Sequence, residues 1–323
     1  MVKITLKEKY SDCFKIGACV NSRSIATHKE LILSEFNSVT CENEMKFAVV
    51  CPDGENYDFT RADAIHRFAV DNGLDLRFHT FLWHNQTPPQ IFEGATRDRL
   101  IASLKKHIDI MAARYGKSVY TCDVANEVIE DKQDSFFRSS PWFEIIGEDF
   151  CDIAFSYAKQ AMPNVKLCYN DYNESNPVKS KKIFDFVKGM KDRGVPVDTL
   201  GLQAHWNIFS PSLDDIRRAF DLYSKLGVNL QVTEMDVSVF AFEDASSIAS
   251  PTAEMLEKQA DLYEKVFGIF REYSEIIDCV TTWGVADDDT WLDRFPFKDR
   301  KNWPLLFGIN HGRKEAWSRI MNF

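Results

Sequence analysis

Two glutamates that end apolar runs are the side chains of this sequence best suited to catalysis. Glu127 ends the run Val-Ala-Asn-Glu, and Glu234 ends the run Val-Thr-Glu. Hydrolysis of a glycosidic bond requires two carboxyl groups that flank it, because one donates a proton to the leaving oxygen while the other attacks the sugar or activates water. A single glutamate at the end of a strand is more often a solvated or paired side chain, so the pair needs support from its surroundings.

Polar and aromatic side chains follow other apolar runs in the same way. His79 and Trp83 come after one run, Gln203 and His205 end another, and Asp236 lies two positions beyond the second glutamate. Taken singly, a histidine or a tryptophan in such a position is more often a packed core residue. Their concentration at equivalent positions of successive runs is what favours a common site.

A metal site is the alternative use of the histidines in these positions. His79, His84 and His205 offer imidazoles, but the sequence contains neither an H-x-H nor an H-E-x-x-H spacing. Paired carboxylates hydrolyse glycosides without a metal or an organic cofactor. We therefore expect no metal and no cofactor in this chemistry.

The elements that must position these residues alternate along the whole chain, as short β-branched runs followed by amphipathic stretches. Eight such repeats favour an α/β fold, a single (β/α)8 TIM barrel in which residues 1–323 form one domain, over a doubly wound sheet. Active sites of such barrels lie at the carboxyl ends of the strands, where the fourth and seventh strands would hold the two glutamates opposite each other. The predicted strands are Lys15–Val20, Ser38–Glu42, Leu74–Trp83, Ser118–Asn126, Lys166–Tyr172, Thr199–Trp206, Asn229–Asp236 and Val280–Val285.

Capping residues mark the beginnings of several predicted helices. Thr60 and Ser212 each precede an amphipathic run and have an aspartate three residues further on. Ser140, Asn176 and Ser250 each stand before a proline, which is favoured at the first helical position.

The charge of the chain argues against a polyanionic partner. Its net charge is −10, from 49 acidic and 39 basic residues, so nucleic acid and anionic membrane surfaces are poor partners and a neutral substrate fits better. The densest basic run, Lys179 with Lys181 and Lys182, is interpreted as the solvated face of a helix. No apolar run approaches the ~18 residues that a membrane span needs.

Cysteine usage and the N-terminal segment bear on the compartment. The eight cysteines form no C-x-x-C pair, and several lie in apolar runs where a free thiol behaves as a small hydrophobic group. The segment Met1–Tyr10 is charged and lacks the apolar region of a secretory signal. A cytoplasmic location is therefore expected rather than secretion, and the oligomeric state is left open.

Six stretches of the sequence resemble the xylanases of glycoside hydrolase family 10. The resemblance runs from about Phe14 to Trp317, and six stretches in the right order and spacing are much more specific than any one of them. It implies a (β/α)8 barrel that cleaves internal β-1,4 bonds of xylan with retention of configuration. The stretches are Thr40–Lys46, His79–His84, Asp123–Glu127, Gly201–His205, Val232–Asp236 and Trp283–Val285.

The resemblance also implies a role for each site residue. Glu127 would be the general acid/base and Glu234 the nucleophile of a double displacement. His205 would hold Glu234 by a hydrogen bond and be held in turn by Asp236, and Asn126 would contact the 2-hydroxyl of the sugar being cleaved. The substrate would be xylan or xylo-oligosaccharides. The subsites would be lined by Glu42, Asn43, Lys46, His79, Trp83 and Gln203, with Tyr172, Trp283 and Trp291 as aromatic walls.

Two positions near the subsites depart from the family pattern. Phe47 stands where the family usually has Trp, and Phe78 stands where it usually has Gly. Because these substitutions do not touch the proposed acids, we expect catalysis to survive and the fine specificity of the glycone subsites to shift.

Three alternatives remain open at this point. A β-1,4-glucanase or mixed-specificity glycosidase would use the same acids, and Trp291 is the candidate wall against the hydroxymethyl group of glucose. Such a wall discriminates only ~10–200-fold. A carbohydrate-binding barrel without catalysis and a metal-dependent hydrolase are the other two alternatives.

Overall fold

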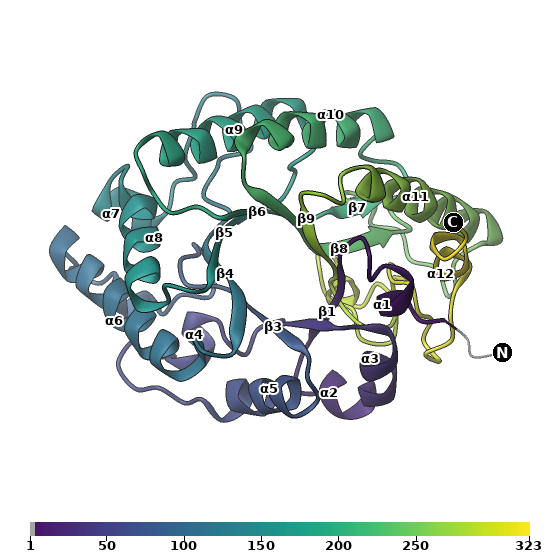
Figure 1. The fold of residues 1–323 in the computed structure, drawn as a ribbon, viewed down its shortest axis with the longest axis horizontal. Coiled ribbons are helices and arrows are strands. Elements are labelled where there is room, and N and C mark those ends of the chain that lie inside the picture. Colours follow the sequence, from purple (N-terminus) through teal and green to yellow (C-terminus); the bar gives the residue numbers. More distant parts are fainter. Residues whose placement is uncertain (1–3) are drawn as a thin grey trace.

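The computed structural model describes residues 4–323, and it is a closed barrel of parallel strands surrounded by helices (Figure 1). Eight of the nine strands form the barrel, which closes where β1 pairs with β9. The prediction of a (β/α)8 barrel is confirmed. The strands are β1 (Lys15–Val20), β2 (Ser38–Cys41), β3 (Asp75–Phe78), β4 (Val119–Asn126), β5 (Lys166–Asp171), β6 (Thr199–Leu202), β7 (His205–Asn207), β8 (Asn229–Ser238) and β9 (Ile277–Thr282).

The helices lie outside the ring of strands and cover its outer face (Figure 1). They are α1 (Leu6–Lys9), α2 (Ser24–Thr27), α3 (Lys29–Glu35), α4 (Phe47–Val50), α5 (Thr60–Asp71), α6 (Arg97–Tyr115), α7 (Pro141–Ile146), α8 (Phe150–Ala161), α9 (Pro177–Asp192), α10 (Leu213–Tyr223), α11 (Ala253–Glu272) and α12 (Glu315–Ile320). Short 3-10 turns span Pro89–Ile91, Ser224–Leu226 and Trp291–Asp293. Within residues 4–323, no helix has the length and apolarity that crossing a bilayer demands.

Three of the five predicted capping residues cap a helix in the structure. The side chains of Ser140, Asn176 and Ser212 accept hydrogen bonds from the first turns of α7, α9 and α10. The prediction for Thr60 is wrong, because α5 begins at Thr60 itself, whose N–H donates to Asp58 at 2.9 Å. The prediction for Ser250 is wrong as well, because α11 is capped two residues later.

Of the eight predicted strands, only Lys15–Val20 has the predicted bounds, and three others differ from the structure by more than two residues or are divided. The third strand ends at Phe78, so the residues that follow form a loop at the barrel mouth. The sixth is split into β6 and β7 at Ala204, which adopts a φ of 58° and breaks the extended backbone. The eighth begins three residues earlier and ends at Thr282. In each case the apolar pattern continues past the regular part of the strand, so it does not mark the end of the strand.

A buried polar layer fills the barrel beneath its mouth. Arg77 forms a bidentate ion pair with Asp123, and its Nε donates to the side chain of Gln231 at 3.0 Å. Asp123 also bonds to the Nδ1 atom of His79 at 2.8 Å. Because the buried charges of Arg77 and Asp123 compensate each other, the ion pair is stable in the barrel interior, and Asp123 fixes the orientation of His79. All eight cysteines are free, and seven of them are buried, as expected for thiols that lie in apolar runs.

Candidate active site

Glu127 and Glu234 lie at the carboxyl ends of opposite barrel strands, as predicted. Glu127 directly follows β4 and has a φ of 56°, in the left-handed region that residues other than glycine seldom adopt. Its N–H donates to the carbonyl of Asn170 on β5 at 2.9 Å, which holds this turn in place. Glu234 lies within β8, and its N–H donates to the carbonyl of Gln203 at 3.1 Å. Both carboxylates are therefore positioned by the barrel itself and not by a free loop.

Three donors surround the carboxylate of Glu127. The indole Nε1 of Trp83 donates to its Oε2 at 2.8 Å, and Gln203 Nε2 and Asn126 Nδ2 donate to its Oε1 at 3.0 and 3.1 Å. The side chain is 13% exposed, so one side of it faces the solvent of the barrel mouth. A carboxyl group with one open side can exchange a proton with a bound substrate or with water.

The carboxylate of Glu234 is more deeply buried, with 6% of its side chain exposed, and its partners are different. Asn170 Nδ2 donates to its Oε1 at 2.7 Å, and His205 Nε2 lies 3.2 Å from its Oε2. Burial raises the pKa of Glu234, but the hydrogen bond from His205 and the charges of His79, His205 and Lys46 outweigh it and bring the pKa to about 2. Glu234 is therefore ionised at neutral pH, as a nucleophile must be.

His205 is held as a cation by two carboxylates. Its Nδ1 atom lies 3.0 Å from Asp236 Oδ2, and its Nε2 atom faces Glu234. Burial lowers the pKa of His205, but Asp236 and Glu234 raise it to about 10. The chain of contacts predicted for this histidine is thus present in the structure.

Two asparagine amides connect the two glutamates. Asn170 Nδ2 donates both to Glu234 Oε1 and, at 2.9 Å, to Asn126 Oδ1, while the Nδ2 atom of Asn126 donates to Glu127. Thr233 Oγ1 donates to Asn170 Oδ1 at 2.7 Å and fixes which way this amide points. The two acids therefore belong to one hydrogen-bond network at the barrel mouth.

Two of the predicted glycone residues, Lys46 and Asn43, contact each other beside Trp83. The ammonium of Lys46 is 4.7 Å from the ring of Trp83, and its Nζ donates to Asn43 Oδ1 at 3.1 Å. Burial lowers the pKa of Lys46, and the carboxylates of Glu234 and Glu42 oppose that shift. Glu42 itself accepts from Asn21 Nδ2 at 2.8 Å. These polar groups offer donors and acceptors to the hydroxyls of a sugar.

Two predicted aromatic walls pack around the histidines. Trp283 lies at 5.5 Å from the ring of His79 and 6.3 Å from that of His205, and its side chain is largely buried. Trp291 lies 4.9 Å from His205, stacks on Phe295, and donates from Nε1 to Asp236 at 2.8 Å. Trp291 is thus tied to the same chain of contacts that holds Glu234.

Tyr172 contacts charged residues beside the Glu127 turn, and its surroundings correct one interpretation of the sequence. Its hydroxyl contacts Asp131 and Arg138, and Arg138 Nε donates to the carbonyl of Glu127 at 2.9 Å. The ammonium of Lys179 lies 3.6 Å from the Tyr172 ring. Lys179 is not on a solvated helix face, because its side chain is 1% exposed and pairs with Asp131 and Asp171.

Phe47 and Phe78 are packed in the core, so neither enters a sugar subsite. Phe47 stacks on His107 with 3.7 Å between ring centroids, and Phe78 packs on Phe81 at 4.5 Å. Successive strand residues face opposite sides, so Arg77 points into the barrel and Phe78 points towards the helices. The expected shift in glycone specificity therefore has no direct contact to support it.

The three histidines weighed as a metal site do not converge. Both ring nitrogens of His205 face carboxylates, and His79 faces Asp123. His84 lies 4.0 Å from Glu127 Oε2, and its Nδ1 atom is buried without a partner. Burial lowers the pKa of His84 to about 4, so this imidazole is neutral beside Glu127.

Asn170 and Thr233 are the residues that sequence reasoning missed. Both lie in predicted strands, Lys166–Tyr172 and Asn229–Asp236, but neither was given a role. The available signal was the position of Asn170 near the end of β5 and of Thr233 directly before Glu234 in β8.

Comparison with known proteins agrees with this geometry. The sequence model of glycosyl hydrolase family 10 matches residues 5–323. The chain is 47% identical to endo-1,4-beta-xylanase B of Paenibacillus barcinonensis, over 98% of this chain and 97% of the relative. It is 44% identical to endo-1,4-beta-xylanase A of Caldicellulosiruptor saccharolyticus, over 100% of this chain and 97% of the relative.

A solved structure shows the same arrangement of the backbone. The crystal structure of xylanase XynB from Paenibacillus barcinonensis, complexed with a conduramine derivative, superimposes with a TM-score of 0.97 at 47% identity and covers 99% of each chain. Since the family match, the relatives and the fold all extend over nearly the whole chain, this protein belongs to glycosyl hydrolase family 10 and is a glycoside hydrolase.

Proposed function

We propose that this protein is an endo-1,4-β-xylanase that hydrolyses internal bonds of xylan or xylo-oligosaccharides with retention of configuration. The observation that carries the mechanism is the contrast between the two acids. Glu234 is buried and held ionised by His205 and Asn170, whereas Glu127 is partly open to the barrel mouth. The substrate follows from the relatives, which are named endo-1,4-beta-xylanases.

In the first step, Glu234 attacks the anomeric carbon while Glu127 donates its proton to the leaving oxygen. The bond between that carbon and the leaving oxygen breaks, and a xylosyl ester of Glu234 forms. In the second step, Glu127 removes a proton from water, the water oxygen attacks the same carbon, and Glu234 leaves as a carboxylate. Two inversions restore the original configuration.

The other residues support these two steps. Asn126 would contact the 2-hydroxyl of the sugar, and it already lies between the two acids. His205 and Asp236 keep Glu234 charged and oriented. Lys46, Glu42, Asn43, His79 and Gln203 would bind glycone hydroxyls. Trp83, Tyr172, Trp283 and Trp291 would present aromatic surfaces to the sugars.

Turnover of aryl xylobioside against aryl cellobioside tests the choice of substrate. We expect the xylobioside to have the higher kcat/KM by about 10–200-fold, because the groups near Trp291 must make room for the hydroxymethyl group of glucose. Release of xylobiose-sized products from xylotetraose would support the endo-xylanase. Cleavage of the cellobioside at an equal or greater rate would instead favour the β-1,4-glucanase, and no turnover of either would favour the binding barrel.

Replacing His205 with glutamine is expected to move the acid limb of the pH profile to higher pH. The change removes the positive charge that helps to hold the pKa of Glu234 at about 2, so Glu234 becomes protonated over a higher pH range. A charge-assisted hydrogen bond contributes about 1.5–3 kcal/mol, which corresponds to a loss of roughly 10–100-fold in kcat/KM.

The measurement is kcat/KM from pH 3 to pH 10, with His66→Gln as the matched control. His66 packs against Tyr115 on the outside of the barrel and touches neither acid. An acid limb that stays in place in His205→Gln would show that His205 does not control the ionisation of Glu234.

A further inference from the structure

Three residues far apart in the sequence meet outside the active site. His28 lies between α2 and α3, Asp288 follows β9, and His311 lies in the turn before α12. One ligand atom from each lies within 4.8 Å of the others. We propose that these residues bind one Zn²⁺ ion through two imidazole nitrogens and one carboxylate oxygen.

The spacing of the ligand atoms suits zinc. Asp288 Oδ1 lies 2.8 Å from His28 Nε2 and 3.4 Å from His311 Nε2. Zinc bonds of about 2.0–2.1 Å in a tetrahedron place ligand atoms roughly 3.3 Å apart. Small rotations of side chains would therefore close the geometry without movement of the backbone. Imidazole and carboxylate ligands also hold ferrous iron, but at equal geometry the divalent series places zinc above iron.

The contact of Thr27 with the Nδ1 atom of His28 leaves the Nε2 atom available to bind a metal ion. Thr27 Oγ1 donates to the carbonyl of Arg23 at 3.1 Å, and it lies 2.7 Å from His28 Nδ1. In the tautomer with the proton on Nδ1, the Thr27 oxygen accepts that proton and the lone pair on Nε2 is directed at Asp288. A metal ion between Nε2 and Asp288 Oδ1, with His311 as the third donor, would take the place of the proton that otherwise joins these two atoms. The His28 side chain is fully buried, which fixes its orientation.

His311 is presented by a strained turn. Its φ is 63°, in the left-handed region, and its N–H donates to the carbonyl of Gly308 at 2.8 Å. The adjacent hydrogen bond from Gly308 to Gly312 closes the turn at 2.9 Å. A non-glycine residue in this conformation often indicates a functional position, since glycine would be favoured on conformational grounds alone.

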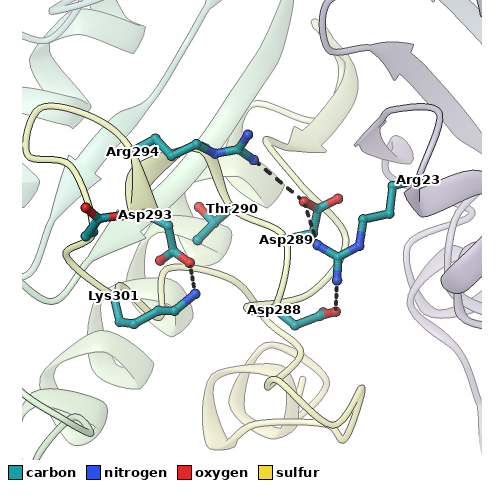
Figure 2. A pocket seen from close by; sticks show the side chains of 8 residues that line it. Arg23, Asp288, Asp289, Thr290, Asp293, Arg294 and Lys301 are labelled. Atoms are coloured by element: carbon teal, nitrogen blue, oxygen red, sulfur yellow. Dashed lines mark hydrogen bonds and ion pairs between the residues drawn. The ribbon is translucent and has the colours of Figure 1, made fainter.

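The second oxygen of Asp288 faces a pocket of about 320 Å³ that also contains Arg23, Asp289 and Arg294 (Figure 2). Arg23 Nη2 lies 3.4 Å from Asp288 Oδ2, as the dashed line in Figure 2 shows. Because Arg23 contacts Oδ2 and both imidazoles face Oδ1, Asp288 would bind the metal through Oδ1 alone. His311 and Asp288 are 36% and 24% exposed, so water can complete the coordination.

A metal at this position would link the first and the last segments of the chain where the barrel closes. β1 pairs with β9 where the barrel closes, and the three ligands follow β1, β9 and the last turn of the chain. The site would act as a clip between distant segments, and binding to the folded state alone would raise the melting temperature.

Isothermal titration calorimetry of the untagged full-length chain with ZnCl₂ tests the proposal, with MgCl₂ as the comparison. We expect one equivalent of zinc to bind and magnesium not to bind, because magnesium prefers oxygen ligands. Zinc at about 100 times its Kd should raise Tm by about 3–5 °C. His311→Gln and Asp288→Asn should each weaken zinc binding by at least about 10-fold, while the matched control His66→Gln should bind as the parent does.

Each result of the zinc titration either supports or overturns the proposed site. Weakening in both ligand variants with the control unchanged supports the site. An absence of saturable zinc binding, or binding that is the same in His311→Gln and in the parent protein, overturns it. In the second case the zinc is bound elsewhere, for example by the half-buried thiol of Cys13.

Discussion

Replacing Glu234 with alanine is expected to reduce kcat on xylotetraose by at least about 10⁴-fold. Without this carboxylate nothing attacks the anomeric carbon, and the positive charge that develops on the sugar is left without its nearest anion. The measurement is the release of reducing ends by the purified variant, with folding checked by circular dichroism. Glu174→Gln is the matched control, because Glu174 is also a buried glutamate, accepts its hydrogen bond from Trp206 at 3.0 Å and is hydrogen-bonded to neither acid.

Azide provides the positive test of the same variant. In Glu234→Ala the small anion can occupy the vacated space and attack an activated aryl xylobioside directly, which displaces the aryl group in one step. The product should then be the α-xylosyl azide. A variant that keeps more than about 1% of its activity on xylotetraose would show that another group performs the attack.

Replacing Glu127 with alanine is expected to affect substrates according to their leaving groups. Xylotetraose needs a proton on its leaving oxygen, so kcat should fall by about 10²–10⁴-fold, the usual contribution of general acid–base catalysis. A dinitrophenyl xylobioside needs no proton, so its first step should survive. Its second step should become slow, because no base activates the water.

A burst of dinitrophenolate followed by slow turnover is the signature of this variant. Azide should accelerate the slow phase and yield the β-xylosyl azide, opposite in configuration to the azide product of Glu234→Ala. Equal losses on both substrates, without a burst, would contradict the role of Glu127 as acid/base.

The barrel could be predicted from the sequence because the same pattern, a strand followed by a helix, is repeated along the whole chain. Buried parallel strands have continuous β-branched runs, and each run is followed by an amphipathic stretch, so the order of elements is visible without any contact information. The residues at strand ends could also be predicted, because in a barrel they converge on one mouth. Glu127, Glu234, His205 and Asp236 were found in this way.

The details that could not be predicted depend on which side each residue faces. Phe78 lies one position after Arg77, and the sequence did not show that the strand directs it away from the sugars. Lys179 looked like a surface residue, but its charge is buried against Asp131 and Asp171. Such buried ion pairs follow neither a periodic pattern nor a short motif that could be recognised in the sequence.

The hydrogen-bond network of the site could not be predicted from the sequence for the same reason. Trp83 was predicted to line a glycone subsite, and the structure shows that its indole N–H also donates to Glu127. The contact of Asn170 with both Asn126 and Glu234 requires β4, β5 and β8 to be placed around the barrel first. The sequence predicts the types of residue at the site, whereas their pairing is a consequence of the fold.

Proton NMR of the first products from xylotetraose tests the central claim most directly. Spectra recorded before mutarotation show which anomer of the new reducing end is released by the enzyme. The double displacement through Glu234 predicts that the β-anomer appears first and that the α-anomer grows in only by mutarotation. If the α-anomer appears first, water has attacked in a single step, and Glu234 is a base rather than the nucleophile.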